Sequence, residues 1–339
     1  MPSARPRPED LLSVTKRGLW CAPGGFFIDP HGKADRAVIT HGHGDHARPG
    51  HAHVLATSET LAIMRARYGD DAGASMQSLA YNDPININSV GVRLIPAGHI
   101  LGSAQVELEW RGVRIVVSGD YKRRPDPTCA PFEPVACDVF VTEATFGLPV
   151  FRHPSDRDEI AKLLGSVALY PERCHLVGVY ALGKCQRVIA LLREAGYDRP
   201  IWIHGALAEL CGLYQSEGVS LGPLKHVTAD DKKNLAGEII LAPPGATAER
   251  WARGMPDPVV AMASGWMRVR GRARQRGVEL PLIISDHADW DELTTSLADV
   301  AAPRVWVTHG REDALVHYAR GEGIDAEPLS LVGYEEEGE

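Results

Sequence analysis

The chain has 339 residues, of which 44% are hydrophobic and 24% charged, and its formal net charge is −8. This length allows two domains with separate cores, and the composition is that of an ordinary globular protein. The negative charge argues against a protein that coats nucleic acid by bulk electrostatics, but a nuclease with bound metal ions remains open. No apolar run is long enough to cross a bilayer, and the first residues lack the apolar core of a signal peptide. We therefore expect a cytoplasmic protein without a membrane partner.

The first half of the chain predicts β-structure with one helix. Residues 1–12 are rich in proline and charge, and we expect a mobile tail there. Ser58 is expected to cap a helix over residues 59–68, because helix formers follow it and a carboxylate lies in the first turn. Apolar or alternating segments predict strands within residues 19–29, 37–39, 84–110, 113–118 and 139–142.

After Gly147 strands alternate with helices, which favours a separate parallel sheet. Ser155 is expected to cap the first of these helices. The helices are predicted at residues 156–170, 181–194 and 206–215, and the strands at residues 174–180, 200–205, 238–244, 258–265 and 280–285. A helix over residues 290–300 and a strand over residues 304–308 follow, and the final EEEGE segment is expected to be solvated.

The segment Arg36–His46, RAVITHGHGDH, places four candidate metal ligands directly after an apolar strand. These are His41, His43, Asp45 and His46, and the glycines between them allow the loop to bend tightly around a small ion. Imidazole and carboxylate suit zinc, manganese or iron, and the lack of cysteine disfavours a closed structural zinc site. Four ligands on one short loop divide most naturally into two pairs, one for each ion of a two-metal centre. The alternative is a histidine-rich surface loop.

Further ligand candidates lie at strand ends and turns, in PAGHILGSA, SGDY and VTHG. Alone, each could be a turn histidine or a capping aspartate. Together with the histidine loop they complete a two-metal centre, which needs about three protein ligands per ion and a bridging carboxylate. The predicted ligands are His41, His43 and His99 for one ion, Asp45, His46 and His309 for the other, and Asp120 as the bridge. Asp29 either accepts a hydrogen bond from a ligating imidazole or simply starts a turn.

In chain order, Asp29 and the motifs HGHGDH, AGHILGSA, SGDY, TEATFG, SDHAD and VTHG resemble the metallo-β-lactamase fold in its β-CASP nuclease branch. The segments ALGKCQRV and MASGW are similar to the inserted domain of that branch and the segment that follows it. The resemblance covers nearly the whole chain after residue 18. It implies an α/β fold, a metallo-β-lactamase αββα sandwich of residues 1–147 and 286–339 with a β-CASP α/β domain inserted at residues 148–285. Within the branch, the GWMRVR…SDHADWDEL tract looks most similar to bacterial DNA-ligase-associated DNA exonucleases.

The resemblance also implies roles for single residues. The seven ligands match two metal sites that share Asp120, with zinc expected and manganese or iron as alternatives. His287 matches the general acid that protonates the leaving oxygen, and Glu143 matches the acid that orients it. Members for DNA cross-link repair often lack the last histidine, so the presence of His309 favours two metal ions. The implied activity is DNA hydrolysis from a 5′-phosphate end, 5′ to 3′, in DNA repair, alongside a DNA ligase and a helicase.

Contacts to the substrate are predicted in the inserted domain. Lys184, Ser264 and Ser285 are candidates for binding a terminal phosphate, with Lys184 as a charge near a helix start. Lys184 stands where RNA-processing members more often carry arginine, which favours DNA. The segment Arg268–Arg276 has an arginine at every second position. As a strand it would place all five guanidinium groups on one face as a track for a nucleic-acid backbone, and as a helix it would be a solvated face.

Three other functions stay open. The chain could be an RNA-processing nuclease of the same branch, a hydrolase of a lactone, thioester or β-lactam, or a binding module without catalysis. The insertion of roughly 140 residues between Glu143 and His287 disfavours a small substrate, which needs no covering domain. Seven intact ligand positions disfavour the binding module.

Overall fold

The computed structural model describes residues 5–329 and divides the chain into two units. Unit 1 consists of Met1–Val150 and His287–Glu339, and unit 2 consists of Phe151–Asp286. Unit 2 is thus inserted between two parts of unit 1. The predicted solvated segment EEEGE lies outside the described residues. Within residues 5–329, each helix is too short or too polar to cross a bilayer.

Unit 1 contains two sheets that pack face to face. Side chains from both, among them Phe26, Ile28, Val106 and Val141, form one buried apolar cluster. The first sheet has the order β1 (Leu12–Thr15), β2 (Gly18–Cys21), β3 (Phe26–Ile28), β4 (Arg36–Val38), β5 (His51–Ala56) and β6 (Gly73–Ser78). The second has the order β19 (Asp325–Pro328), β18 (Arg304–Gly310), β11 (Val139–Ala144), β10 (Val113–Val117), β9 (Ala104–Trp110), β8 (Val90–Pro96) and β7 (Pro84–Ile87).

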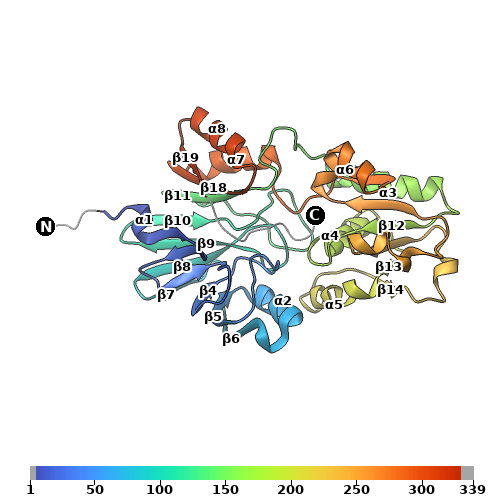
Figure 1. Cartoon of the computed structure of the whole chain (residues 1–339), viewed down its shortest axis with the longest axis horizontal. Helices are drawn as coiled ribbons and strands as arrows, with labels where there is room; N and C mark the ends of the chain where they lie inside the picture. Colours follow the sequence, from blue (N-terminus) through green and yellow to red (C-terminus); the bar gives the residue numbers. More distant parts are fainter. Residues whose placement is uncertain (1–4, 330–339) are drawn as a thin grey trace. The chain divides into compact units, whose positions relative to one another are not determined.

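Helices cover the outer faces of both sheets. The helix α2 (Ser58–Tyr68) packs on the first sheet through Leu61 and Met64. The helices α7 (Trp290–Val300) and α8 (Glu312–Gly321) pack on the second sheet, and they lie on the opposite side of unit 1 from α2 (Figure 1). Unit 1 therefore has the helix–sheet–sheet–helix layers that the resemblance implied.

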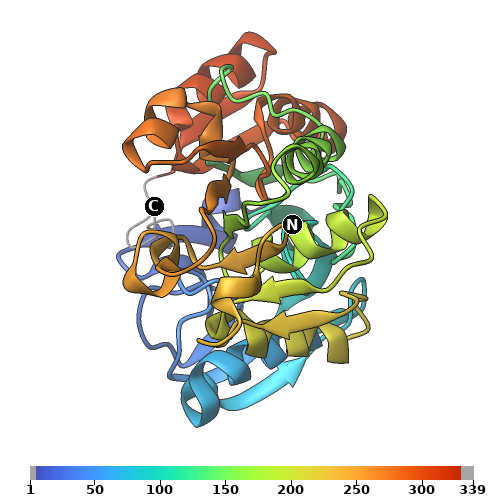
Figure 2. The same ribbon diagram turned by 90° about the vertical axis from the view of Figure 1, so that its right-hand side faces the viewer.

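Unit 2 is built on one sheet whose strands are all parallel, as the alternating pattern predicted. Figure 2 shows these strands side by side, with helices beside them. The sheet order is β14 (Leu224–His226), β13 (Ile201–Ile203), β15 (Ile239–Ala242), β12 (His175–Gly178), β16 (Val259–Ala263) and β17 (Leu280–Leu282). The helices are α3 (Asp156–Leu169), α4 (Lys184–Glu194), α5 (Ala208–Ser216) and α6 (Arg270–Gln275).

Some local predictions were wrong at element ends. Residues 1–12 are not wholly a tail, because α1 (Pro8–Leu11) leads into β1 and buries Leu11 and Leu12 completely. Thr57 caps α2 in place of Ser58, since its side chain accepts the Thr60 N–H. The helix α4 begins three residues later than predicted, after Gly183, whose φ is +84°.

The strand interpretation of the arginine-rich segment was also wrong. The 3-10 helix η6 (Gly265–Arg268) and α6 form there instead. Helical turns bring Met267 and Ala273 into one small apolar cluster with Met262.

Candidate metal centre

The predicted ligands lie at the ends of strands from both sheets of unit 1. The histidine loop follows β4, and Asp120 follows β10. His99 lies between β8 and β9, where the Ser103 side chain accepts its backbone N–H at 3.0 Å. His309 is the extra residue of a bulge where β18 pairs with β11, and its φ is +58°. Bulges of this kind redirect a side chain, which explains how a strand residue reaches the loop ligands.

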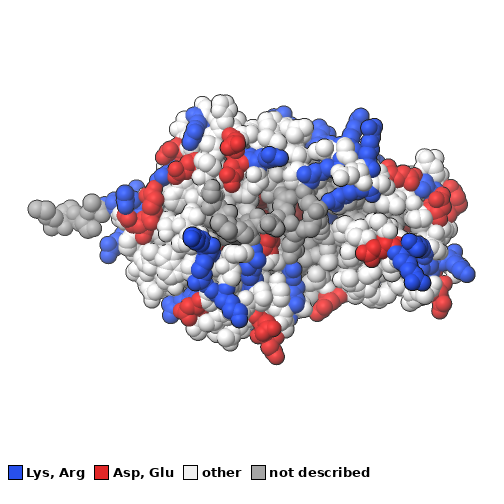
Figure 3. Space-filling model, viewed as in Figure 1, with Lys and Arg blue, Asp and Glu red and all other residues white. Residues whose placement is uncertain are grey.

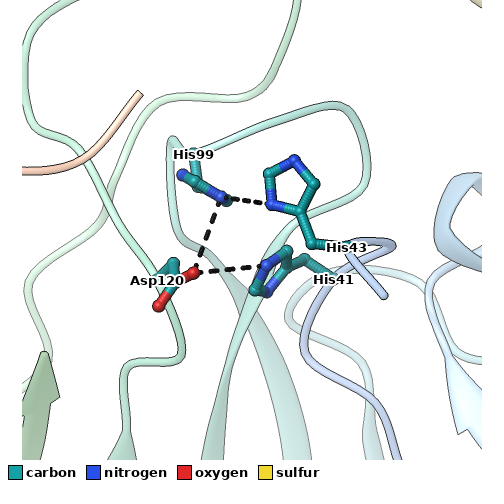
Figure 4. A group of neighbouring side chains, drawn as sticks. All are labelled: His41, His43, His99 and Asp120. Carbon is teal, nitrogen blue, oxygen red and sulfur yellow. Dashed lines mark hydrogen bonds and ion pairs between the residues drawn. The ribbon is translucent and has the colours of Figure 1, made fainter. Parts of the chain in front are cut away.

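The first predicted ligand set is assembled, since the ligand atoms of His41, His43, His99 and Asp120 all lie within 4.8 Å of one another (Figure 4). His99 Nε2 is 3.0 Å from His43 Nδ1 and 3.8 Å from Asp120 Oδ2. His41 Nε2 is 3.4 Å from the same carboxylate oxygen. The rings thus converge on a point beside Asp120, and three of the four side chains are buried.

One residue of the second predicted set, His46, reaches Asp120, and the other two lie near His46. His46 Nε2 lies 3.4 Å from Asp120 Oδ2 and 3.6 Å from Asp45 Oδ2. The His46 and His309 rings are 5.4 Å apart between centroids. Asp120 Oδ2 is therefore close to nitrogen atoms from both sets, which is the position that a bridging carboxylate needs.

Asp29 orients the His46 ring directly and contacts the His41 ring through Thr40. Its carboxylate accepts from His46 Nδ1 at 2.8 Å, which turns His46 Nε2 toward Asp120. It also accepts the Thr40 backbone N–H at 2.8 Å and the Thr40 hydroxyl at 2.6 Å. The Thr40 oxygen is in turn 3.0 Å from His41 Nδ1. Sequence reasoning missed Thr40, because its role depends on a contact with Asp29 that spacing does not reveal.

Burial and the central carboxylate set the charge of the cluster. Burial lowers the pKa of His41 well below its usual value and that of His309 to about 4. For His46, burial disfavours the charged ring, but Asp120 and Asp45 outweigh it and raise the pKa well above its usual value. Burial also disfavours ionised Asp120, yet the His46 charge and hydrogen bond hold its pKa well below the usual range.

These residues fit a divalent metal ion. Metal ligands must be neutral imidazoles and ionised carboxylates, and the pKa directions of His41, His309 and Asp120 meet that requirement. The raised pKa of His46 is opposite in direction, so His46 would release its proton when an ion binds. His43 Nδ1 and His99 Nε2 lie at hydrogen-bond distance, 3.0 Å, and a bound ion would replace the proton that they share. The nitrogen and oxygen ligand set suits zinc, manganese or iron.

A second pair of predicted residues borders the cluster. His287 Nδ1 lies 3.0 Å from Glu143 Oε2, and the His287 ring is 4.7 Å from that of His99. Glu143 is fully buried and also accepts the Tyr121 N–H at 2.8 Å. One ligand atom each from Asp120, Glu143 and His287 also lie within 4.8 Å of one another. The structure thus brings His287 beside the metal-ligand cluster with one ring nitrogen held by a carboxylate.

The chain after His287 is anchored by an arginine that sequence reasoning missed. Arg124 Nη2 binds Asp289 Oδ2 at 2.9 Å, and its backbone N–H donates to Glu292 Oε1 at 2.5 Å. Asp289 and Glu292 form the capping box of α7. The Ala288 N–H donates to the Tyr121 carbonyl at 2.6 Å, so the segment is held to the strand end that carries Asp120.

The predicted phosphate-binding residues all lie in unit 2. Lys184 is at the start of α4, as predicted, but it is buried and its Nζ pairs with Asp286 Oδ2 at 3.0 Å. Ser264 caps η6, and the Ser285 carbonyl accepts from Arg187. Arg187 is fully buried and also binds Asp156 and Asp286. A phosphate role for the three predicted residues stays a prediction.

Comparisons with known proteins are consistent with this centre. No family model matches the chain. A probable DNA ligase from Opitutus terrae is 28% identical over 321 residues, which cover 91% of this chain and 30% of that protein. Cleavage and polyadenylation specificity factor subunit 3 from Dictyostelium discoideum is 31% identical over 153 residues, 42% of this chain and 19% of that protein. Endoribonuclease YSH1 from Saccharomyces cerevisiae is 28% identical over 153 residues, 42% of this chain and 20% of that protein.

The chain thus spans less than a third of these relatives' lengths. A crystal structure of a protein of unknown function from Enterococcus faecalis V583 aligns with a TM-score of 0.61 at 13% identity, covering 91% of this chain and 83% of that chain. That likeness concerns the fold alone. The layers of unit 1, its inserted unit and these relatives confirm the predicted fold class, a metallo-β-lactamase αββα sandwich with an inserted β-CASP domain.

Proposed function

We propose that this chain is a metal-dependent hydrolase of DNA phosphodiester bonds, an exonuclease that starts at a 5′-phosphate end and acts in DNA repair. The observation that supports the proposal is the assembly of the first predicted ligand set around Asp120. His46 of the second set lies 3.4 Å from Asp120 Oδ2, and His287 lies beside His99. When bound, two divalent ions would neutralise charge on the phosphate and activate the attacking water.

Carboxylate and histidine side chains of the protein would bind the ions and supply the proton for the reaction. Asp120 and the imidazoles would hold the ions, and Asp29 would keep His46 in the required orientation. Glu143 accepts from His287 Nδ1, which leaves Nε2 to deliver a proton to the leaving oxygen. Histidine suits this step because its charge changes near neutral pH, and the nearby carboxylate favours the protonated ring.

We propose DNA rather than RNA as the substrate because of how much of this chain each relative matches. The relative named a probable DNA ligase matches 91% of this chain, whereas the relative named an endoribonuclease matches 42%. A DNA ligase is proposed as a functional partner from the resemblance and from the name of this relative, of which the matching region occupies 30%. A helicase of the same pathway is proposed with less support, because it rests on the resemblance alone.

An RNA-processing nuclease is the second candidate, favoured by the names of the relatives from Dictyostelium and yeast. Digestion of matched DNA and RNA strands, labelled at the 5′ or 3′ end and supplied with zinc or manganese, separates the two. The proposal expects mononucleotides released from the 5′ end of DNA and slower cleavage of RNA. Preferential internal cleavage of RNA would replace the proposal with the second candidate. Comparing 5′-phosphate with 5′-hydroxyl ends tests whether the protein recognises a terminal phosphate. This is the role predicted for Lys184, Ser264 and Ser285.

A further inference from the structure

The basic segment Arg268–Arg276 of unit 2 has no part in the site described above. It contains five arginines, and no aspartate or glutamate occurs between Asp257 and Glu279. Both of these flanking acids bind Arg173, at 3.0 Å for Asp257 Oδ2 and 2.6 Å for Glu279 Oε1. The whole chain has a net charge of −8, so the positive charge is concentrated in this segment. Figure 3 shows Lys and Arg side chains gathered where Figure 1 labels α6.

The helix α6 and its C-cap residue Arg276 arrange four of these arginines in two rows. Ala273 is buried and packs with Met262 and Met267, so it marks the inner side of the helix. At 3.6 residues per turn, Arg270 and Arg274 flank Ala273 on one side and Arg272 and Arg276 flank it on the other. Arg270, Arg274 and Arg276 are exposed. Each row consists of like charges four positions apart, which repel each other and therefore favour a bound polyanion.

Aromatic side chains hold Arg272 in place. The Arg272 guanidinium lies 4.0 Å from the centroid of the Trp266 ring. The Trp266 ring in turn packs edge to face with Phe151 at 5.2 Å between centroids. Because the arginine stem and ring are already ordered, binding an anion here loses less side-chain freedom than binding at a free surface arginine.

A glycine lies on the outward face between the rows. Gly271 has no positive φ, and a Cβ atom built on it would meet nothing within 4 Å. The fold therefore does not require glycine at this position, although glycine inside a helix is unfavourable. Because Gly271 has no side chain, nothing projects from α6 between the arginine rows, and another backbone can approach there.

We propose that this arginine helix, α6 with the flanking residues Arg268 and Arg276, is a docking surface for the sugar–phosphate backbone of the nucleic-acid substrate. The proposal rests on the proposed nuclease function. Guanidinium groups match phosphate oxygens with two parallel hydrogen bonds, and a nucleic-acid strand presents phosphates at regular intervals to both rows. An acidic protein segment is the alternative partner that the test below distinguishes.

The test compares binding by the full chain and by the variant Arg270→Gln/Arg274→Gln. The probe is a fluorescent single strand with a hydrolysis-resistant phosphorothioate backbone, and anisotropy is measured between about 50 and 200 mM salt. The control variant Lys16→Gln/Arg111→Gln removes two exposed cations from turns of unit 1. We expect the arginine-helix variant to lose about 1.4 from the slope of log affinity against log salt, since each phosphate contact on a single strand contributes about 0.7. The control is expected to keep the original slope.

Hydrolysis of bis(p-nitrophenyl) phosphate separates this proposal from the proposed function. Both variants are expected to hydrolyse this small diester at the original rate, because neither alters the metal centre. A slope that stays unchanged in the arginine-helix variant, or that falls equally in the control, overturns the docking surface. Displacement of the strand by polyglutamate at equal charge concentration also overturns it, in favour of an acidic protein partner. Failure of the unaltered chain to hydrolyse either DNA or the small diester overturns the nuclease function instead.

Discussion

The substitution Glu143→Gln tests the proposed proton donor most directly. Glu143 is fully buried and contacts His287 Nδ1 at 3.0 Å and the Tyr121 N–H at 2.8 Å. Glutamine has the same shape and can still accept from Tyr121, so the variant removes mainly the charge. A hydrogen bond to a charged group is worth about 1.5–3 kcal/mol and a neutral one about 0.5–1.5 kcal/mol. The protonated state of His287 should therefore lose about 1.4 kcal/mol, which is a tenfold change.

The assay is a pH–rate profile of DNA hydrolysis by the metal-loaded enzyme. The descending limb, where the proton donor is lost, is expected to move about one pH unit to the acid side, and turnover above it to fall about tenfold. A p-nitrophenyl phosphodiester should be hydrolysed at nearly the original rate, because its leaving group needs no proton. The control is Glu109→Gln, a strand glutamate whose side chain is 60% exposed.

Two results would refute this reasoning. One is an unchanged descending limb in the Glu143→Gln variant with normal metal content. The other is an equal loss of rate on DNA and on the p-nitrophenyl diester, which would assign Glu143 to the metal centre. The second outcome is meaningful because Asp120, Glu143 and His287 also lie close enough to hold an ion.

Three further changes have expected outcomes. Asp29→Ala removes the acceptor of His46 Nδ1 and of Thr40, and we expect metal affinity to fall about 10–100-fold, measured by competition with a chromogenic chelator. An unchanged affinity would reduce Asp29 to a turn residue. Burial lowers the pKa of His309 from 6.5 to about 4, so the metal-free folded protein binds fewer protons than the unfolded chain between these values. Its free energy of unfolding should therefore fall as the pH drops from 6.5 toward 4, and His309→Ala should weaken that fall in urea titrations. Gly271→Ala should raise the free energy of unfolding by about 0.5–1 kcal/mol, since the helix is open at that position; a loss of stability would show that the glycine is structurally required.

Local sequence patterns predicted much of the fold and of the candidate site. The histidine loop was recognisable because its four predicted ligand side chains are neighbours in the chain, and a tight loop brings neighbours together in any fold. The alternation of strands and helices after Gly147 predicted a parallel sheet, which unit 2 has. The helix over residues 290–300 was predicted with the bounds that α7 shows, because its cap and its apolar spacing are both local signals.

Other features depended on contacts between distant parts of the chain. Residues 8–12 are ordered because Leu11 and Leu12 fill the core between the sheets, which their proline-rich surroundings do not reveal. The arginine-rich segment is helical, with Ala273 and Met267 packed against Met262 of a neighbouring strand, although alternate arginines fit a strand equally well.

The sequence by itself determined which side chains are available to bind metal, because residue type and close spacing are written in the chain. Only the tertiary structure decided how they meet. His99, Asp120 and His309 reach the histidine loop because two sheets end their strands at the same place and a bulge redirects His309. The roles of Thr40 and Arg124 likewise arise from hydrogen bonds across the fold. Such bonds join residues that no local pattern relates, since they depend on the packing of whole sheets.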